Sequence, residues 1–186
     1  MRILVVGAGP TGLTAAVELA RRGLVPEVID RKENHSTLSR AVGILPRSLN
    51  ILKLSGVTDR LITDGIKVRQ VKFYHEEKNT LTVPLSGSHP DWDFILALAQ
   101  DRTEAALRDT FVKLGGLVSY GTALSGLHEE TDGVVVRSGD GDEDRYDLVI
   151  GADGTRSRVR ECLSLDYIGF DLRDSWSIAD VEAENW

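Results

Sequence analysis

The sequence predicts an α/β fold that opens with a strand–helix–strand unit. Residues 2–7 form a nearly continuous apolar run, which is typical of a parallel strand buried on both faces. The next segment, roughly residues 11–22, is predicted to be a helix that ends before Gly23, a residue favoured just past a helix C-terminus. Its apolar side chains recur at helical spacing: Leu13, Ala16, Val17 and Ala20. Residues 25–30 form a second short strand, so a right-handed crossover is expected.

Further helices are predicted in the middle of the chain, after a loop at residues 36–45. A helix at about 46–55 begins at Pro46, a good first-turn residue, and ends at Gly56, and a short helix follows it. Residues 100–114 are also expected to be helical. Their apolar side chains lie on one face: Leu107, Phe111 and Leu114.

Additional strands complete the predicted architecture. Residues 66–85 alternate in places and indicate two strands around the sequence EEKNT, which interrupt the α/β pattern and are expected to join a second sheet. Between 117 and 150, tight-turn sequences separate several strands and predict a small antiparallel sheet. The last of these strands, DLVIG at 147–151, is apolar and ends in glycine. Residues 175–183 are expected to begin another strand.

Composition excludes several classes of function. The chain has 186 residues and a net charge of −7, which argues against a nucleic-acid binder. The apolar run at residues 3–6 is far too short to span a membrane or to serve as a signal sequence. A single cysteine, Cys162, cannot form an internal disulfide and favours a cytoplasmic location. The four histidines lack metal-ligand spacing, so no metal site is expected.

The first glycine-rich loop predicts a dinucleotide site in a Rossmann-like βαβ unit. GAGPTG matches G-x-G-x-x-G: Gly7 permits a tight turn, Gly9 lets a pyrophosphate approach the backbone, and Gly12 permits close packing of helix on strand. Asp30 ends the second strand, where a carboxylate can hold adenosine ribose hydroxyls. These residues do not separate FAD from NAD. The bland alternative is a glycine turn needed only for packing.

A second loop, GADGTRSRVR at 151–160, raises the question of whether the chain binds two nucleotides or one long nucleotide at two places. A third interpretation makes Asp153 and Gly154 a mere turn between a strand and a helix, since Asp-Gly pairs are common in turns. Arg156, Arg158 and Arg160 are expected to be solvated helix residues, with Arg160 a candidate ion-pair partner.

Three sequence blocks resemble the N-terminal part of the class A flavoprotein monooxygenases, the p-hydroxybenzoate hydroxylase-like aromatic hydroxylases. The first is VVGAGPTGLTAAVELARRG with VIDR, and the second is SRAVGILPRSLNILKLSGVTDRL followed by LAQDRTEAALRD. The third, DLVIGADGTRSRVRE, is similar to the family's Asp-Gly fingerprint, which ordinary NAD-binding Rossmann domains lack. The resemblance implies one FAD, touched by both loops.

The resemblance also implies which residues contact FAD. The first loop would surround the pyrophosphate with Gly7, Gly9, Pro10, Thr11 and Gly12. The remaining contacts would be made by Asp30 and Arg31 at the adenosine, Arg40 at the pyrophosphate or flavin side, Gln100 at the ribityl region with Glu104 behind it, Leu124 through its backbone at the adenine, and Asp153 with Gly154 at the middle of the cofactor. Arg40 could instead be a solvated loop arginine, and Gln100 a polar residue at a helix start.

The implied activity is hydroxylation of an aromatic or polyketide-like small molecule, with NADPH or NADH reducing FAD and O2 supplying the oxygen. No catalytic side chain is assigned, because the cofactor carries the chemistry. Three alternatives remain: a flavin-dependent double-bond reductase of the same fold, a non-catalytic FAD-binding module or split subunit, and a plain NAD-dependent dehydrogenase, which the second fingerprint disfavours.

The predicted domains are both incomplete. Residues 1–65 and 96–165 are assigned to the FAD-binding domain, and residues 66–95 and 166–186 to the start of a substrate-binding domain. A later Gly-Asp fingerprint of the family is absent. The chain is therefore expected to be an N-terminal portion that is inactive alone, and that self-associates or awaits a C-terminal half.

Overall fold

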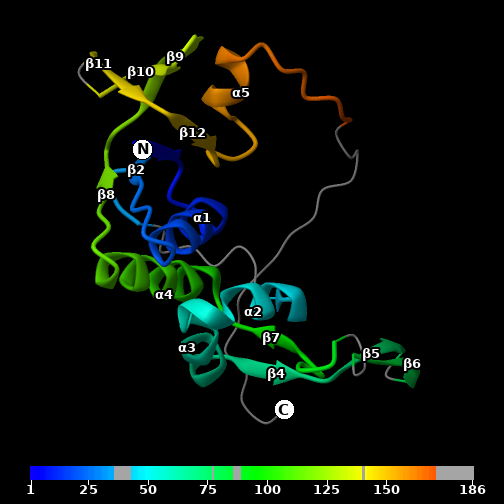
Figure 1. Ribbon diagram of the computed structural model, residues 1–186. Helices are drawn as coiled ribbons and strands as arrows, with labels where there is room; N and C mark the ends of the chain where they lie inside the picture. Colours follow the sequence, from blue (N-terminus) through cyan, green and yellow to red (C-terminus); the bar gives the residue numbers. More distant parts are fainter. Residues whose placement is uncertain (36–42, 77, 86–88, 140, 171–186) are drawn as a thin grey trace.

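The computed structural model describes residues 1–35, 43–76, 78–85, 89–139 and 141–170 (Figure 1). Its helices are α1 (Pro10–Ala20), α2 (Pro46–Leu52), α3 (Val57–Asp64), α4 (Gln100–Lys113) and α5 (Arg158–Cys162), with a 3-10 helix at Lys53–Ser55. The helix expected at 46–55 is thus α-helical only to Leu52 and tightens into a 3-10 turn before Gly56, whose φ of 76° ends it.

A four-stranded parallel sheet forms the centre of the molecule. Its strands are β1 (Ile3–Val6), β2 (Glu27–Asp30), β8 (Val118–Tyr120) and β12 (Leu148–Gly151), in the order β12-β1-β2-β8. Every neighbouring pair runs parallel. The predicted α/β class with an N-terminal βαβ unit is therefore confirmed.

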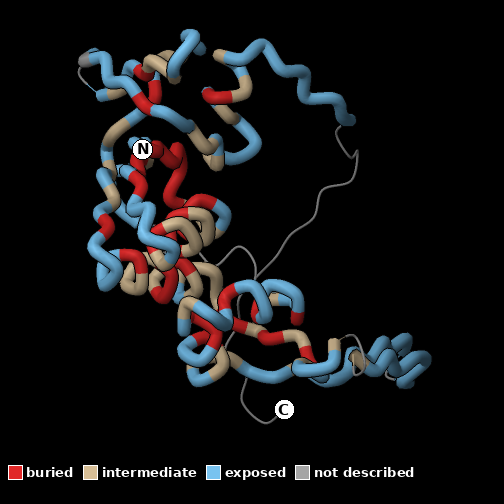
Figure 2. Tube along the Cα trace, in the orientation of Figure 1, coloured by how far each residue is buried: buried red, intermediate tan, exposed pale blue. Residues whose placement is uncertain are grey.

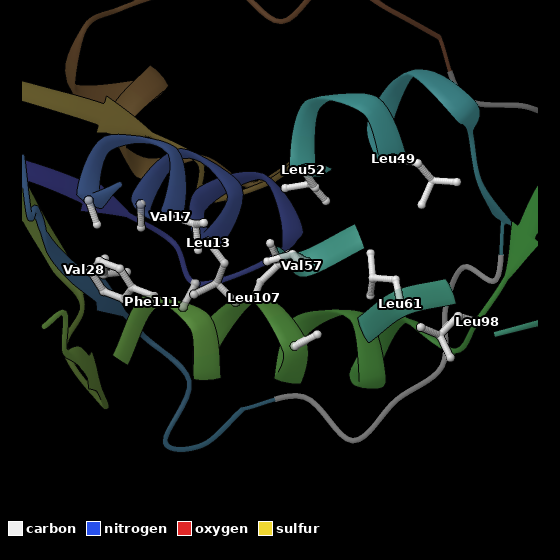
Figure 3. Close-up of a cluster of buried hydrophobic side chains, with 14 of the residues drawn as sticks. Leu13, Val17, Val28, Leu49, Leu52, Val57, Leu61, Leu98, Leu107 and Phe111 are labelled. Carbon is white, nitrogen blue, oxygen red and sulfur yellow. The ribbon is translucent and has the colours of Figure 1, made fainter. Parts of the chain in front are cut away.

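One face of this sheet packs on helices. Val5 and Val28 point toward α1 and α4, and the same apolar core contains Leu13, Leu107 and Phe111, all close to fully buried (Figure 3). The apolar residues of α1 recur at helical spacing, so they lie on one side of the helix, and that side faces this core.

The opposite face packs on an antiparallel sheet and on α5. That sheet has the order β11-β10-β9, from β9 (Leu124–Glu130), β10 (Gly133–Ser138) and β11 (Asp142–Tyr146). Leu4, Val6 and Ile29 of the parallel sheet form a second core with Val136 and Val159. Neighbouring residues of β1 thus serve opposite layers, because side chains alternate along a strand. The expected small antiparallel sheet is confirmed.

A third sheet lies beside α2 and α3, away from the antiparallel layer (Figure 1). It contains β3 (Gly43–Ile44), β7 (Ile95–Ala97) and β4 (Ile66–Val68), with β7 in the middle. Leu49, Leu61 and Leu96 bury this sheet against the two helices. Because β7 pairs with both β3 and β4, residues on the two sides of the predicted domain limit at 95/96 share one sheet. The domain limits remain a prediction.

A hairpin of β5 (Gln70–His75) and β6 (Lys78–Pro84) extends from this third sheet (Figure 1). All of its described residues are exposed (Figure 2). The two strands expected around EEKNT are present, although the first of them is divided into β4 and β5. The strand expected at 175–183 lies outside the described residues.

Candidate cofactor-binding site

The carboxyl ends of the parallel strands bring both glycine-containing loops together. Val6 pairs with Ile29 on one side and with Gly151 on the other, so the chain leaves β1, β2 and β12 at one edge of the sheet. Two hydrogen bonds extend this pairing past the strand ends: Gly7 N–H donates to the Ile29 carbonyl at 2.8 Å, and Ala152 N–H donates to the Val6 carbonyl at 2.8 Å. Ligands of open α/β sheets bind at this edge.

The two loops touch backbone to backbone at Gly7. Its φ is +106°, and a Cβ built there would lie 2.4 Å from the carbonyl oxygen of Ala152 and 2.9 Å from the amide nitrogen of Asp153. A Cβ on Gly12 would lie 1.8 Å from the Gly7 carbonyl oxygen. Gly7 is therefore required for the packing of one loop against the other, and Gly12 for the packing of α1 against the first loop.

Gly9 differs from its neighbours, because a Cβ there would have nothing within 4 Å. It is the N-cap of α1, no side chain caps the helix, and Pro10 occupies the first turn. The start of α1 therefore presents free N–H donors and the positive end of the helix dipole to open space beside a residue without a side chain. This arrangement fits a pyrophosphate.

Asp30 fixes the shape of the first loop. Its Oδ2 accepts a hydrogen bond from Ala8 N–H at 2.7 Å, and its Oδ1 accepts one from Lys32 N–H at 2.9 Å. Each carboxylate oxygen has a second lone pair, so the half-buried side chain can still accept from a ribose hydroxyl. The neighbouring Arg31 is exposed. Both residues lie where the sequence places the adenosine end of the cofactor.

Asp153 is turned toward its own helix. Its Oδ1 accepts from the Ser157 hydroxyl at 2.6 Å, and its Oδ2 accepts from Arg158 N–H at 2.5 Å and from Val159 N–H at 3.2 Å. The carboxylate thus stabilises the start of α5. Gly154, with a φ of +82° and open space around it, presents backbone to the outside of the turn. A contact between FAD and either residue stays a prediction.

Two of the three arginines in the second loop have structural contacts. Arg158 donates from Nη2 to the carbonyl of Ser125 at 2.9 Å and thereby ties α5 to β9. Arg160 donates to the Thr155 carbonyl at 2.9 Å and lies 4.6 Å from the Tyr167 ring centroid. These two side chains hold the turn in place in addition to meeting solvent.

The other predicted contacts lie in different parts of the fold. Gln100 begins α4, is half-buried, and donates from Nε2 to Oε1 of Glu104 at 2.7 Å. The side chain of Leu124 is buried in the second core. A contact between Leu124 and the adenine would therefore have to use its backbone. Arg40 lies outside the described residues.

Tyr120 is a member of this region that the sequence did not indicate. It pairs with Asp30 across β2 and β8, and burial raises the pKa of its phenol although a hydrogen bond with Arg108 opposes the shift. A short strand that ends in tyrosine does not indicate that this residue will lie beside Asp30. The raised pKa keeps the hydroxyl of Tyr120 protonated on the strand beside Asp30.

Neither metal ligands nor a membrane span stand out in the described part of the chain. Within residues that the structure describes, no group of three or more His, Cys, Asp or Glu side chains is placed to hold a metal ion. In the same residues, no helix combines the length and apolarity needed to cross a bilayer.

A family model described as the FAD binding domain matches residues 1–186. The chain belongs to this FAD-binding family. Its cofactor is therefore FAD, as the resemblance implied, and the open N-terminus of α1 fits the pyrophosphate of that cofactor.

Relatives and solved structures agree with this assignment. The chain is 35% identical over 185 residues to 6-methylpretetramide 4-monooxygenase of Streptomyces rimosus, covering 97% of this chain and 33% of that protein. A ternary complex of aklavinone-11 hydroxylase with FAD and aklavinone is 31% identical with a TM-score of 0.78, covering 88% of this chain and 34% of that one.

A Diels-Alderase of pyrroindomycin biosynthesis is also similar, at 28% identity and a TM-score of 0.78, covering 91% of this chain and 36% of that one. The chain thus spans about a third of the length of the proteins it resembles.

Proposed function

We propose that this chain is the cofactor-binding part of a flavin-dependent monooxygenase that hydroxylates an aromatic or polyketide-like small molecule, using NADPH or NADH and O2. The relatives named as monooxygenases support the reaction class. The substrate is taken to be small and aromatic because those relatives are named for pretetramide and pentachlorophenol substrates. A cytoplasmic location is part of the proposal and rests on the single cysteine.

The observation that carries the proposal is the contact between Gly7 and Ala152, which places the glycine-rich loop beside the Asp-Gly loop at one edge of the sheet. Because the two loops touch, one ligand can meet both of them. A single extended dinucleotide meets the start of α1 with its phosphates, and the backbone around Gly154 lies next along the same edge.

The residues of this chain bind and orient the cofactor. The N–H groups at the start of α1 would hold the phosphates, and Asp30 would accept from ribose hydroxyls while it keeps Ala8 and Lys32 in place. FAD, when bound, supplies the redox chemistry that moves electrons from the nicotinamide to oxygen. None of the described side chains is assigned a proton-transfer role.

The test uses the longest polypeptide that contains this chain, loaded with FAD and given NADPH or NADH, ¹⁸O-labelled O2 and a panel of phenols and polycyclic aromatic compounds. The proposal expects at least one compound to accelerate NAD(P)H oxidation and to gain one ¹⁸O atom. A product with a reduced double bond and no ¹⁸O would favour the reductase alternative. A product formed without O2 or NAD(P)H consumption, as the similarity to a Diels-Alderase allows, would contradict the monooxygenase.

A further inference from the structure

Arg2 lies where the chain passes between the two sheets that enclose the second core. β11 ends at Tyr146 and β12 begins at Leu148, so Asp147 alone connects the antiparallel sheet to the parallel sheet. The backbone N–H of Arg2 donates to Oδ2 of Asp147 at 2.5 Å, and the Arg2 carbonyl accepts from Asp147 N–H at 2.9 Å. The corner between the sheets is therefore fixed to the residue that precedes β1.

The side chain of Arg2 joins the same two sheets. Its Nη2 donates to Oε1 of Glu27, the first residue of β2, at 2.9 Å, and its Nη1 donates to the carbonyl of Arg145 in β11 at 3.1 Å. The guanidinium also lies over the ring of Tyr146, 4.6 Å from the ring centroid. Because Tyr146 is only 4% exposed and belongs to the second core, Arg2 covers one end of that core.

Glu27 is held at both of its carboxylate oxygens. Oε1 accepts from Arg2, and Oε2 accepts from the hydroxyl of Tyr146 at 2.8 Å. An isolated ion pair at the surface contributes little to stability, whereas charged groups joined in a network contribute more. Hydrogen bonds to an ionised group are also stronger than neutral ones. These three side chains therefore form a firm connection between the parallel and the antiparallel sheet.

The antiparallel sheet and α5 form one layer, which lies across the parallel sheet from α1 and α4 (Figure 1). Val136 of β10 and Val159 of α5 are both buried in the second core, and Nη2 of Arg158 in α5 donates to the Ser125 carbonyl of β9 at 2.9 Å. Among the described residues, the second core is the smaller of the two. Because three strands need a packed apolar face to be stable, this layer unfolds if it separates from the parallel sheet.

We propose that Arg2, Glu27 and Tyr146 form a latch that holds the antiparallel sheet and α5 on the parallel sheet, and that these two elements open together while the core around α1 and α4 stays folded. Proteins commonly open in such cooperative units, at a lower free energy than global unfolding. The Asp-Gly loop joins β12 to α5, so this opening frees the side of the cofactor site that the loop forms. The latch itself needs no bound cofactor.

The experiment measures opening of the chain without FAD by the labelling of buried thiols. In a Cys162→Ser background, which removes the natural thiol, one of three buried valines is replaced: Val17→Cys in α1, Val136→Cys in β10 or Val159→Cys in α5. A thiol reagent reaches each position only when the surrounding structure opens. We expect equal labelling rates at positions 136 and 159, and a slower rate at position 17.

The latch is then released in each of these proteins. Arg2→Gln removes the guanidinium and Tyr146→Phe removes only the hydroxyl, and each should raise the labelling rates at positions 136 and 159 about fivefold, the size of one lost hydrogen bond. Arg60→Gln is the matched control, because it removes a partly exposed ion pair with Asp109, at 2.8 Å, that joins α3 to α4. It should leave the rates at positions 136 and 159 unchanged.

Each alternative result would overturn a stated part of the proposal. Equal labelling at all three positions in the protein with an intact latch would show that the chain opens only as a whole. Faster labelling at position 136 than at position 159 would show that α5 does not open with the sheet. Rates that Arg2→Gln and Tyr146→Phe leave unchanged, or that Arg60→Gln raises equally, would show that the three residues are not a latch.

Discussion

Gly7 and Ala152 lie so close that a Cβ on Gly7 would be 2.4 Å from the Ala152 carbonyl oxygen. The first residue of the glycine-rich loop is therefore packed against the loop that follows the last strand of the sheet. This contact places the two sequence fingerprints side by side at one edge of the sheet.

Replacing Gly7 with alanine should damage the fold as well as the site. The φ of +106° is strained for any residue with a Cβ, and the carbonyl it would strike is backbone that cannot turn away. We expect Gly7→Ala to lower the free energy of unfolding by about 3 kcal/mol or more, measured by urea denaturation. A variant of unchanged stability would show that the loops are not in contact.

Asp153→Ala should destabilise α5, because three hydrogen bonds to the start of that helix are lost. The expected loss is about 1–2 kcal/mol in the free energy of unfolding, typical of a removed helix cap. Ser157→Ala, which loses its own bonds to Asp153 and to Arg160 N–H, is the matched control and should show a loss of about 1 kcal/mol. If Asp153→Ala weakens FAD binding but leaves the free energy of unfolding unchanged, the carboxylate binds the ligand and does not stabilise the helix.

Glu18 should contribute stability that disappears in acid. Its carboxylate accepts from Arg21, which lowers its pKa below the ordinary value of 4.5 although burial opposes the shift. A lowered pKa in the folded state means that the contribution is present above pH 4.5 and is lost as pH falls below it. Glu18→Gln should therefore be less stable by about 0.5–1 kcal/mol at pH 7, and the difference should shrink steadily as pH falls below 4.5, in urea titrations across that range. A constant difference would contradict the ion pair.

Tyr146 should make the fold sensitive to alkali. Its side chain is 4% exposed and its hydroxyl donates to Oε2 of Glu27 at 2.8 Å, and burial raises its pKa. A raised pKa in the folded state means that the contribution is present below the ordinary value of about 10 and is lost as pH rises above it.

Tyr146→Phe should therefore be about 1 kcal/mol less stable at pH 7, and the gap to the unsubstituted chain should narrow above pH 10. Tyr120 is unchanged in both proteins, so the difference between their urea midpoints isolates Tyr146. A gap that widens with pH would contradict the assignment.

Local patterns account for the parts of the fold that could be predicted. The apolar run before Gly7, the helical spacing after it and the carboxylate of Asp30 depend on residues near one another in sequence, and the βαβ unit follows from them. The separation of β4 from β5 could not be foreseen, because β4 is defined by its pairing with β7, a distant strand.

The two loops could be recognised in the sequence, but the contacts within them could not. The sequence indicates that Asp153 belongs to a fingerprint, yet the capping of α5 by its carboxylate depends on how the turn closes. A charged residue in a helix such as Glu104 is ordinarily expected to be exposed, and its burial follows from the packing of α4 in the core. Ser157, three residues before Arg160, is a side-chain cap whose position the sequence could have indicated.

The most direct test of the shared FAD site is an FAD titration of the chain and of Gly9→Ala, followed by flavin fluorescence, with a parallel urea denaturation. A Cβ on Gly9 meets no protein atom within 4 Å, so the free energy of unfolding should fall by about 1 kcal/mol or less, the cost of alanine at a helix N-cap. The same Cβ occupies the space through which the pyrophosphate reaches the start of α1, so the Kd for FAD should rise by about tenfold or more. Equal affinity of the two proteins for FAD would contradict a cofactor site at this edge of the sheet.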